Sequence, residues 1–289
     1  IQIGMITDAE WLDIDNDGDM DLAVVGEYMP ISIFENVNGK FENSTKKAGL
    51  NESHGWWNAL TVGDLDGDGD DDFVIGNHGT NTMFKGSFQE PVQMYVNDFD
   101  RNGSLDHVIC IYKDGISYPH VLKHDLLAQL PGLNSKYADY KSFRYQTIDS
   151  IFTPSQLENA LILNAYHLKT SIAINNGDGS FTLRSLPTEA QLSPVYAISV
   201  YDYDSDGVKD ILLAGNLYDV KPEVGRYDAS YGTFLKGKGQ LEYKAIPAHI
   251  TGFKVQGEAR DMAIIESGGK KRLMIARNND ALQVFDLNE

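Results

Sequence analysis

The sequence predicts an all-β fold, a β-propeller of about six four-stranded blades, because similar acidic loops and similar hairpins recur along the chain. Four segments share an Asp-rich loop that leads into an apolar strand, and they begin at residues 13, 64, 98 and 202. The steps of 51 and 34 residues suit one repeat each, and the step of 104 residues suits two. A period of about 40 to 50 residues is typical of propellers.

The second element of the repeat is a hairpin in which two alternating strands meet at a Gly-rich turn. It occurs at residues 31–43, 171–183 and 232–244. Because no acidic loop directly precedes 171–183, we expect this hairpin to belong to a separate repeat that has lost its loop. Residues 259–285 repeat an inner strand pair, with a Gly-Gly turn in place of the loop. These features give six repeats, and a seventh blade would have to lie outside this fragment.

Each blade should consist of an inner strand that ends in the acidic loop, a second strand and an outer hairpin. We expect one propeller domain over residues 1–289, with a further blade near 160–186. The inner strands of the propeller are expected at residues 5–12, 57–63, 92–97, 196–201 and 259–265.

Residues 119–163 break this pattern and predict a helical insertion between blades. Leucines and Val121 recur there near a helical period until Pro131. A second helix is expected after Thr153, because Pro154 and Gln156 complete a capping-box signature with it. The apolar face of the insertion is expected to pack on the blades.

Composition excludes several classes of function. The chain has 24 Lys and Arg against 42 Asp and Glu, a net charge of −18. This charge excludes nucleic acid and anionic lipid as partners and favours cations. The only cysteine, Cys110, lies in an apolar strand, so no intrachain disulfide forms. The sequence contains no transmembrane segment, and its start at Ile1 is what we expect of a fragment of a larger protein.

The acidic loops offer the oxygen ligands and the sharp turn that Ca²⁺ requires. Side-chain oxygens occupy positions 1, 3, 5 and 9 of each loop, a Gly occupies position 6, and position 7 offers its main-chain carbonyl oxygen. We expect three to four structural Ca²⁺ ions. Mg²⁺ is disfavoured because it demands near-ideal octahedral geometry. The predicted metal ligands are Asp13, Asp15, Asp17, Asp19 and Asp21; Asp64, Asp66, Asp68, Asp70 and Asp72; Asp98, Asp100, Asn102, Ser104 and Asp106; and Asp202, Asp204, Asp206, Val208 and Asp210.

Two other interpretations of the loops are possible. An EF-hand requires a bidentate Glu at position 12, where these loops place Val24, Ile75 and Leu213 inside strands. Asp, Asn and Gly also favour turns without any metal. We prefer metal binding because four or five carboxylates packed without a cation would repel one another.

The pattern DxDxDGxxD before an apolar strand, repeated with NNGDGSF-type hairpins, resembles the FG-GAP/VCBS repeats of integrin α-subunit propellers and many bacterial surface proteins. The segments GWWNALTVGDLDGDGD, AGNLYDVKPEVGRYDASYG and ARNNDALQVF resemble exported bacterial proteins of the cartilage-acidic-protein-like, ASPIC/UnbV-associated group. The resemblance implies a propeller fold, bound calcium and an extracellular, cell-surface or periplasmic location. It implies no reaction.

We expect the ligand face to lie opposite the calcium loops, where the second strands end. The residues there are rich in aromatic and amide side chains, which suit a carbohydrate or protein ligand. The alternative is that they are ordinary turn residues and that the Trp pair packs between blades. The predicted ligand-binding residues are Glu27, Tyr28, Trp56, Trp57, Asn77, His78, Asn216, Tyr218, Arg226, Tyr227, Arg277 and Asn278.

We therefore favour a calcium-binding extracellular scaffold for binding or adhesion over an enzyme. The sequence has no HExxH or GxSxG motif, and no catalytic residues are predicted. One alternative is a propeller-based polysaccharide lyase or hydrolase with structural calcium, in which His78, Arg226 or Tyr227 would act on the substrate. The other is a structural spacer in a larger surface protein.

Overall fold

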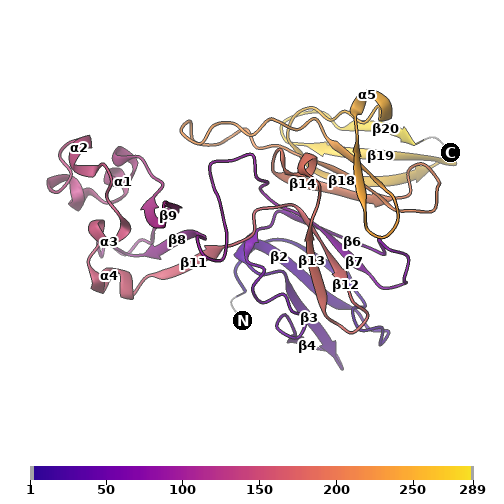
Figure 1. Ribbon diagram of the computed structural model, residues 1–289, viewed down its shortest axis with the longest axis horizontal. Helices are drawn as coiled ribbons and strands as arrows, with labels where there is room; N and C mark the ends of the chain where they lie inside the picture. The colour runs from indigo at the N-terminus through magenta and orange to yellow at the C-terminus, as the bar shows by residue number, and fades with distance from the viewer. Residues whose placement is uncertain (1–2, 288–289) are drawn as a thin grey trace. The chain divides into compact units, whose positions relative to one another are not determined.

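The computed structural model describes residues 3–287, which form two compact units built mainly from antiparallel β-sheets (Figure 1). Unit 1 comprises the chain up to Met83 and from Leu168 onward. Unit 2 comprises Phe84–His167. No helix in residues 3–287 is long and apolar enough to cross a membrane.

Unit 1 contains four sheets within the described residues, and in each the strands are paired in chain order. The first consists of β1 (Met5–Leu12), β2 (Asp21–Met29), β3 (Ser32–Val37) and β4 (Lys40–Asn43), with β5 (Gly55–Trp56) beside β2. The second consists of β6 (Ala59–Gly63), β7 (Asp72–Gly76), β12 (Ser171–Asn175) and β13 (Phe181–Ser185). The third consists of β14 (Val195–Tyr201), β15 (Asp210–Gly215), β16 (Thr233–Gly237) and β17 (Tyr243–Ile246), and the fourth of β18 (Ala259–Ser267), β19 (Lys270–Arg277) and β20 (Gln283–Leu287). Two short helical turns, η2 (Thr188–Gln191) and α5 (Ala248–Thr251), connect these strands.

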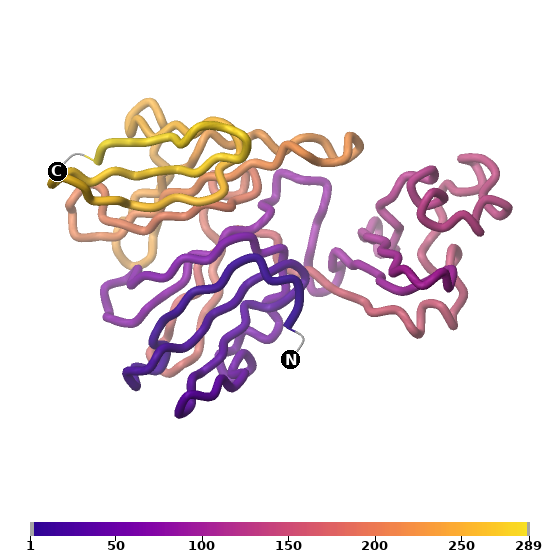
Figure 2. The backbone as a smooth tube through the Cα atoms, turned by 180° about the vertical axis from the view of Figure 1, so that it is seen from behind, coloured from indigo at the N-terminus to yellow at the C-terminus, as the bar shows by residue number. Residues whose placement is uncertain are grey.

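The first three sheets follow the predicted order of inner strand, acidic loop, second strand and outer hairpin, whereas the fourth has three strands and no acidic loop within the described residues. The prediction that residues 171–183 form a separate blade is wrong. The hairpin β12–β13 completes the second sheet, because β12 pairs with β7 with Ser171 opposite Ile75. Figures 1 and 2 show this hairpin beside strands that precede it by about a hundred residues in the chain. Phe181 of the hairpin stacks on Phe73 of β7, with ring centroids 4.8 Å apart. Unit 2 is therefore inserted between the second and third strands of one blade.

The blades pack in sequence through their inner strands, because β6 contacts β1, β14 contacts β6, and β18 contacts β14. Each interface has an apolar core: Trp57 lies in the first, Ile211 in the second and Leu273 in the third. No comparable contact joins β18 back to β1 within residues 3–287. Four blade-like sheets are thus present in unit 1, and a closed propeller of six or seven blades stays a prediction.

Unit 2 is a four-stranded sheet covered by short helices. The strands are β8 (Val92–Asn97), β9 (Asp106–Lys113), β10 (Ile116–Pro119) and β11 (Leu161–Ala165), in the order β10-β9-β8-β11. The helices are α1 (Lys123–Gln129), η1 (Pro131–Ser135), α2 (Tyr140–Phe143), α3 (Ile148–Ile151) and α4 (Pro154–Glu158). The capping box predicted before α4 is present at Thr153 and Gln156.

The insertion is larger than the predicted helical segment 119–163. It includes β8, β9 and the third acidic loop, which the sequence assigned to a propeller blade. Its strand order also differs from that of a blade, because β11 returns beside β8 rather than beside β10. The helices pack on the sheet through their own core, in which Phe99 stacks on Phe152 at 3.9 Å between ring centroids.

The second sheet can be tested by a cross-link. We expect Ser171→Cys with Ile75→Cys to form a disulfide under mild oxidation, because paired Cα atoms of antiparallel strands lie about 4.5 to 5.5 Å apart. Burial raises the pKa of Cys110 to about 12, so the native thiol should not compete. The control pair, Ser171→Cys with Phe73→Cys, is two residues out of register and should link much less. Mass spectrometry of peptides decides, and equal linking of both pairs would contradict this register.

Candidate functional site

The four acidic loops connect β1 to β2, β6 to β7, β8 to β9 and β14 to β15. In each, carboxylate oxygens from three Asp residues lie within 4.8 Å of one another. This spacing allows one cation to contact several of them. The clusters are Asp13, Asp15 and Asp17; Asp64, Asp66 and Asp72; Asp98, Asp100 and Asp106; and Asp202, Asp204 and Asp206.

Main-chain geometry holds these carboxylates in place. In the first loop, Asp13 accepts hydrogen bonds from the backbone N–H groups of Asp17 at 3.1 Å and Gly18 at 3.0 Å. The same bonds recur at Asp98 and Asp202. Position 6 is a Gly with positive φ in every loop, which explains the invariant Gly of the repeat. Position 4 is also left-handed, and it is occupied by Asn16, Gly67, Arg101 and Ser205.

The Asp at position 9 has a role that the sequence did not indicate. Asp21, Asp72, Asp106 and Asp210 are at most 3 % exposed. One oxygen of each accepts a hydrogen bond from the backbone N–H at position 2 of its own loop. In unit 1 the other oxygen accepts from a backbone N–H of the third strand or its turn, at Asn36, Asn175 or Gly237. We call this residue the clamp aspartate, because it ties the loop to its blade.

Only part of each predicted ligand set belongs to the three-carboxylate groups. Asp72 and Asp106 belong to the clusters of their loops, whereas Asp21 and Asp210 lie outside the three-carboxylate groups of theirs. Asp68, at position 5 of the second loop, also lies outside its group and accepts a hydrogen bond from the Asp70 backbone N–H; Asn102, at position 5 of the third loop, accepts one from that of Ser104. A carboxylate oxygen that accepts one N–H retains a lone pair, so these bonds leave metal binding open.

Electrostatics within the loops favours a cation. Burial, and then the neighbouring carboxylates, raise the pKa of Asp19. Its Oδ1 atom is buried with no hydrogen-bond partner among the described residues. The pKa of Asp66 is raised by burial, with repulsion from Asp68 and Asp64 adding to it. A divalent ion would remove the repulsion and satisfy the oxygens.

The first two loops contact each other. Asn16 Nδ2 donates a hydrogen bond of 2.8 Å to Asp70 Oδ1. Asp70 stands at position 7, where the sequence assigned the metal contact to its carbonyl oxygen, and its side chain reaches the neighbouring loop. These two predicted sites therefore lie side by side at the same ends of their blades.

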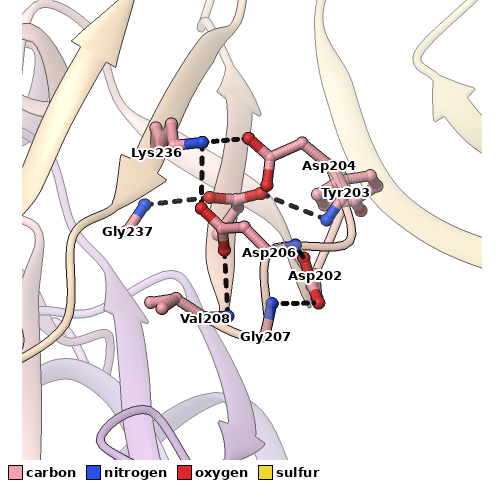
Figure 3. Close-up of polar contacts among 9 residues, drawn as sticks. Asp202, Tyr203, Asp204, Asp206, Gly207, Val208, Lys236 and Gly237 are labelled. Carbon is pink, nitrogen blue, oxygen red and sulfur yellow. Dashed lines mark hydrogen bonds and ion pairs between the residues drawn. The ribbon is translucent and has the colours of Figure 1, made fainter.

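In the fourth loop a lysine ammonium pairs directly with two of the clustered carboxylates. Figure 3 shows Lys236 of β16 directed at the loop, where its Nζ pairs with Asp204 and lies 3.0 Å from an oxygen of Asp206. The hydrogen bonds to Asp204 and Asp206 raise the pKa of Lys236. The hydrogen bond from Lys236 lowers the pKa of Asp206. Val208 at position 7 donates its backbone N–H to Asp206.

Several predicted ligand-face residues form an aromatic row across three blades. Tyr28 and Trp56 lie 5.5 Å apart between ring centroids, Trp56 and His78 5.1 Å, and His78 and Tyr227 4.6 Å. The Tyr227 hydroxyl is 2.9 Å from that of Thr82. Burial lowers the pKa of His78 to about 4, so its ring is neutral near pH 7. The edge-to-face contacts fix the row as one unit.

Other predicted ligand-face residues serve the fold. Trp57 is fully buried between the first two blades and donates its ring N–H to the Ser53 carbonyl, as the alternative interpretation expected. Asn77 and Asn216 are buried, and Asn216 Nδ2 donates to the carbonyls of Ser230 and Gly257. These three side chains are not available to a ligand at the surface.

The remaining predicted residues lie near the surface. Arg226 stacks on Tyr218, with its guanidinium 3.4 Å from the ring centroid. Arg277 pairs with Asp280 at 2.9 Å, and Asn278 Nδ2 donates to Glu258. Desolvation raises the pKa of Glu27.

A central cavity was missed by sequence reasoning. It has a volume of about 790 Å³ and is lined by the inner strands of all four blades of unit 1. Thr7, Asn58, Tyr196 and Arg260 line it from one equivalent position of the repeat. At three of them a β-bulge shifts the register between inner and second strand. Bulges re-aim side chains and are common beside functional sites.

A signal that could have pointed to two of the bulges is a Gly in the second strand, which occurs at Gly26 of β2 and Gly215 of β15 but not in β19. A Cβ atom on Gly215 would overlap the Pro194 carbonyl oxygen, and one on Gly26 would overlap that of Met5. In the first and third blades a Gly therefore stands where the bulged inner strand approaches the second strand closely. In the sequence this residue reads as a simple strand end.

The cavity wall is polar and acidic. Arg260 lies 4.6 Å over the Tyr196 ring and pairs with Glu258 at 2.7 Å, so its charge is balanced within the wall. Burial raises the pKa of Glu10, and so do the charges of Asp8 and Asp261. Hydroxyl, amide, carboxylate and aromatic groups thus face one space, the combination found in sites for polar organic ligands.

Comparison with known proteins supports the repeat. Residues 13–75 match the model of the FG-GAP-like repeat, a segment that holds the first two acidic loops. The comparison with curated proteins found no match. Among solved structures, the chain is similar to the V. cholerae biofilm matrix protein Bap1 at 10% identity and a TM-score of 0.31. That alignment covers 98% of this chain and 63% of Bap1, so the chain spans less than two thirds of that protein. The resemblance to FG-GAP repeats is confirmed for residues 13–75, and the ASPIC/UnbV-associated assignment stays a prediction.

The clamp aspartate can be separated from metal binding by two variants of the first loop. Asp21→Ala leaves the buried N–H of Ile14 and the partly buried N–H of Asn36 without their acceptor, which should cost about 2 to 4 kcal/mol of unfolding free energy. We expect this loss in chelator as well as in calcium. Asp15→Ala removes an exposed carboxylate and should change stability in chelator very little. Urea unfolding measures both, and equal losses in chelator would contradict the clamp.

Proposed function

We propose that the protein is a calcium-binding β-blade scaffold that acts outside the cell and binds a carbohydrate or protein ligand at the end of the blades opposite the acidic loops. The observation that carries the calcium assignment is the set of four loops, each with three carboxylates grouped within 4.8 Å. The match of residues 13–75 to the FG-GAP-like repeat supports the same assignment. An extracellular location would supply the millimolar calcium that such loops need.

The ligand site is proposed at the central cavity, because Tyr28, Trp56 and Tyr227 of the aromatic row are at most 8 % exposed and offer a ligand little surface. The groups that line the cavity come mainly from the inner strands β1, β6, β14 and β18, which favours a preorganised site. Carbohydrate recognition combines aromatic platforms with amide and carboxylate hydrogen bonds, and the cavity offers Tyr196 and Asn58 beside its acidic residues. The site would bind its ligand without any contribution from the calcium ions.

A polysaccharide-cleaving enzyme is a second candidate, and one observation favours it. Glu10 has a raised pKa and lies near Asp8 and Asp261 in one cavity, which is the pairing of carboxylates that glycoside hydrolysis uses. The residues named from the sequence for this role suit it less. His78 is held among aromatic rings with a pKa of about 4, and Arg226 stacks on Tyr218.

Removal of calcium should lower the melting temperature. With dissociation constants of about 10⁻⁴ to 10⁻³ M, 1 mM calcium adds about 0.4 to 1.4 kcal/mol per site, so several sites should shift the midpoint by several degrees. Asp66→Ala should remove part of this shift, whereas Asp228→Asn, far from the loops in sequence, should keep it. Calorimetry with and without chelator measures the effect. An unchanged midpoint, with the ions shown to have left, would contradict a structural role.

The cavity can be tested with an array of oligosaccharides, including oligomers of uronic acids and amino sugars. We expect Tyr196→Ala to reduce binding at least tenfold, because the ring lines the cavity and supports Arg260. Tyr231→Ala, which changes a more exposed tyrosine, serves as the control. Release of reducing ends from a bound oligomer, abolished by Glu10→Gln, would favour the enzyme. Binding that both Tyr variants retain would place the ligand elsewhere.

A further inference from the structure

We propose that Lys236 is a built-in competitor for calcium, which makes the fourth loop a weaker calcium site than the first and second loops. The inference rests on the proposed calcium function and goes beyond it, because it ranks the sites. The direct observation is the pairing of the Lys236 ammonium with Asp204 and Asp206, two of the three carboxylates that would hold the ion (Figure 3).

The position of Lys236 in its blade is defined by the clamp. Gly237, the next residue, donates its N–H to the clamp aspartate Asp210 at 2.9 Å. In the first and second blades the matching N–H groups belong to Asn36 and Asn175. The residues directly before these, and so equivalent to Lys236, are Glu35 and Ile174. One repeat position thus carries a negative, a neutral and a positive side chain in the three blades.

The charges at this position predict the order of affinity. Glu35 adds a carboxylate on the strand beside the first loop, and Lys47 pairs with it at 2.7 Å. Ile174 adds no charge to the second loop. Lys236 places a cation where the ion would bind, so calcium must displace it and leave it beside a divalent charge.

Within residues 3–287, the third loop, in unit 2, has no residue equivalent to Lys236. In unit 2 the strand beside β9 is β10, and no backbone N–H of β10 is bonded to Asp106 among the described contacts. The three loops of unit 1 are therefore the ones whose calcium affinities differ by this position. Lys236 makes the fourth loop the last of these to fill as calcium rises, and the first to empty.

The test is calcium titration of the whole chain by isothermal calorimetry, with Asp202→Ala used to identify the signal of the fourth loop. We expect Lys236→Met to tighten that site by roughly three- to tenfold, because one half-exposed ion pair and the repulsion of Ca²⁺ are removed. The matched control is Lys244→Met, because Lys244 lies opposite Lys236 in the antiparallel pairing of β16 and β17. It should leave the affinity of the site nearly unchanged.

A reciprocal variant tests the position itself. Ile174→Lys should weaken the second loop and leave the fourth unaffected, and circular dichroism shows whether it folds. Calcium binding with one affinity at all three loops, unchanged by Lys236→Met, would overturn the ranking and leave the proposed calcium function in place. No calcium binding by the folded wild type or by Lys236→Met would overturn both.

Discussion

Three blades of unit 1 carry an acidic loop, and each depends on one buried carboxylate. That carboxylate accepts hydrogen bonds from two backbone N–H groups in different parts of its blade. The clamp aspartate joins the start of its loop to the third strand, so the loop cannot move without disturbing the blade. A buried acceptor of this kind is costly to leave unmatched, and both partners are supplied by main chain. Loop shape, carboxylate spacing and strand register therefore follow from one residue per repeat.

Much of this arrangement could be predicted from the sequence, because the same residue pattern recurs in each repeat. The inner strands, the acidic loops and the capping box at Thr153 all depend on local patterns. The pairing of Ser171 with Ile75 depends on contacts across about a hundred residues, which no local pattern encodes. The cavity was missed for a related reason: Thr7, Asn58, Tyr196 and Arg260 are chemically unlike, so no residue pattern marks their shared position, and the bulges at three of them appear only in the strand pairing.

Within the loops, the sequence predicted which residues carry oxygen but not what each oxygen does. Position 9 was assigned to the metal, yet its burial and its backbone bonds give it a structural task. The pairing of Lys236 with the fourth loop was invisible because the lysine stands about thirty residues away, on a strand whose register was unknown. The charge around an acidic loop thus depends on side chains of a neighbouring strand as well as on the residues of the loop itself.

The interrupted second blade has a consequence for how the chain reaches this state. During synthesis β6 and β7 emerge well before β12 and β13, so their edge and the ring of Phe73 stay uncovered until the whole inserted unit has been made. The contact between Ser171 and Ile75 closes a long loop, which slows assembly unless the insert folds first and brings its ends together. Early folding of residues 84–167 would therefore help β12 and β13 to reach β7 and complete the second blade.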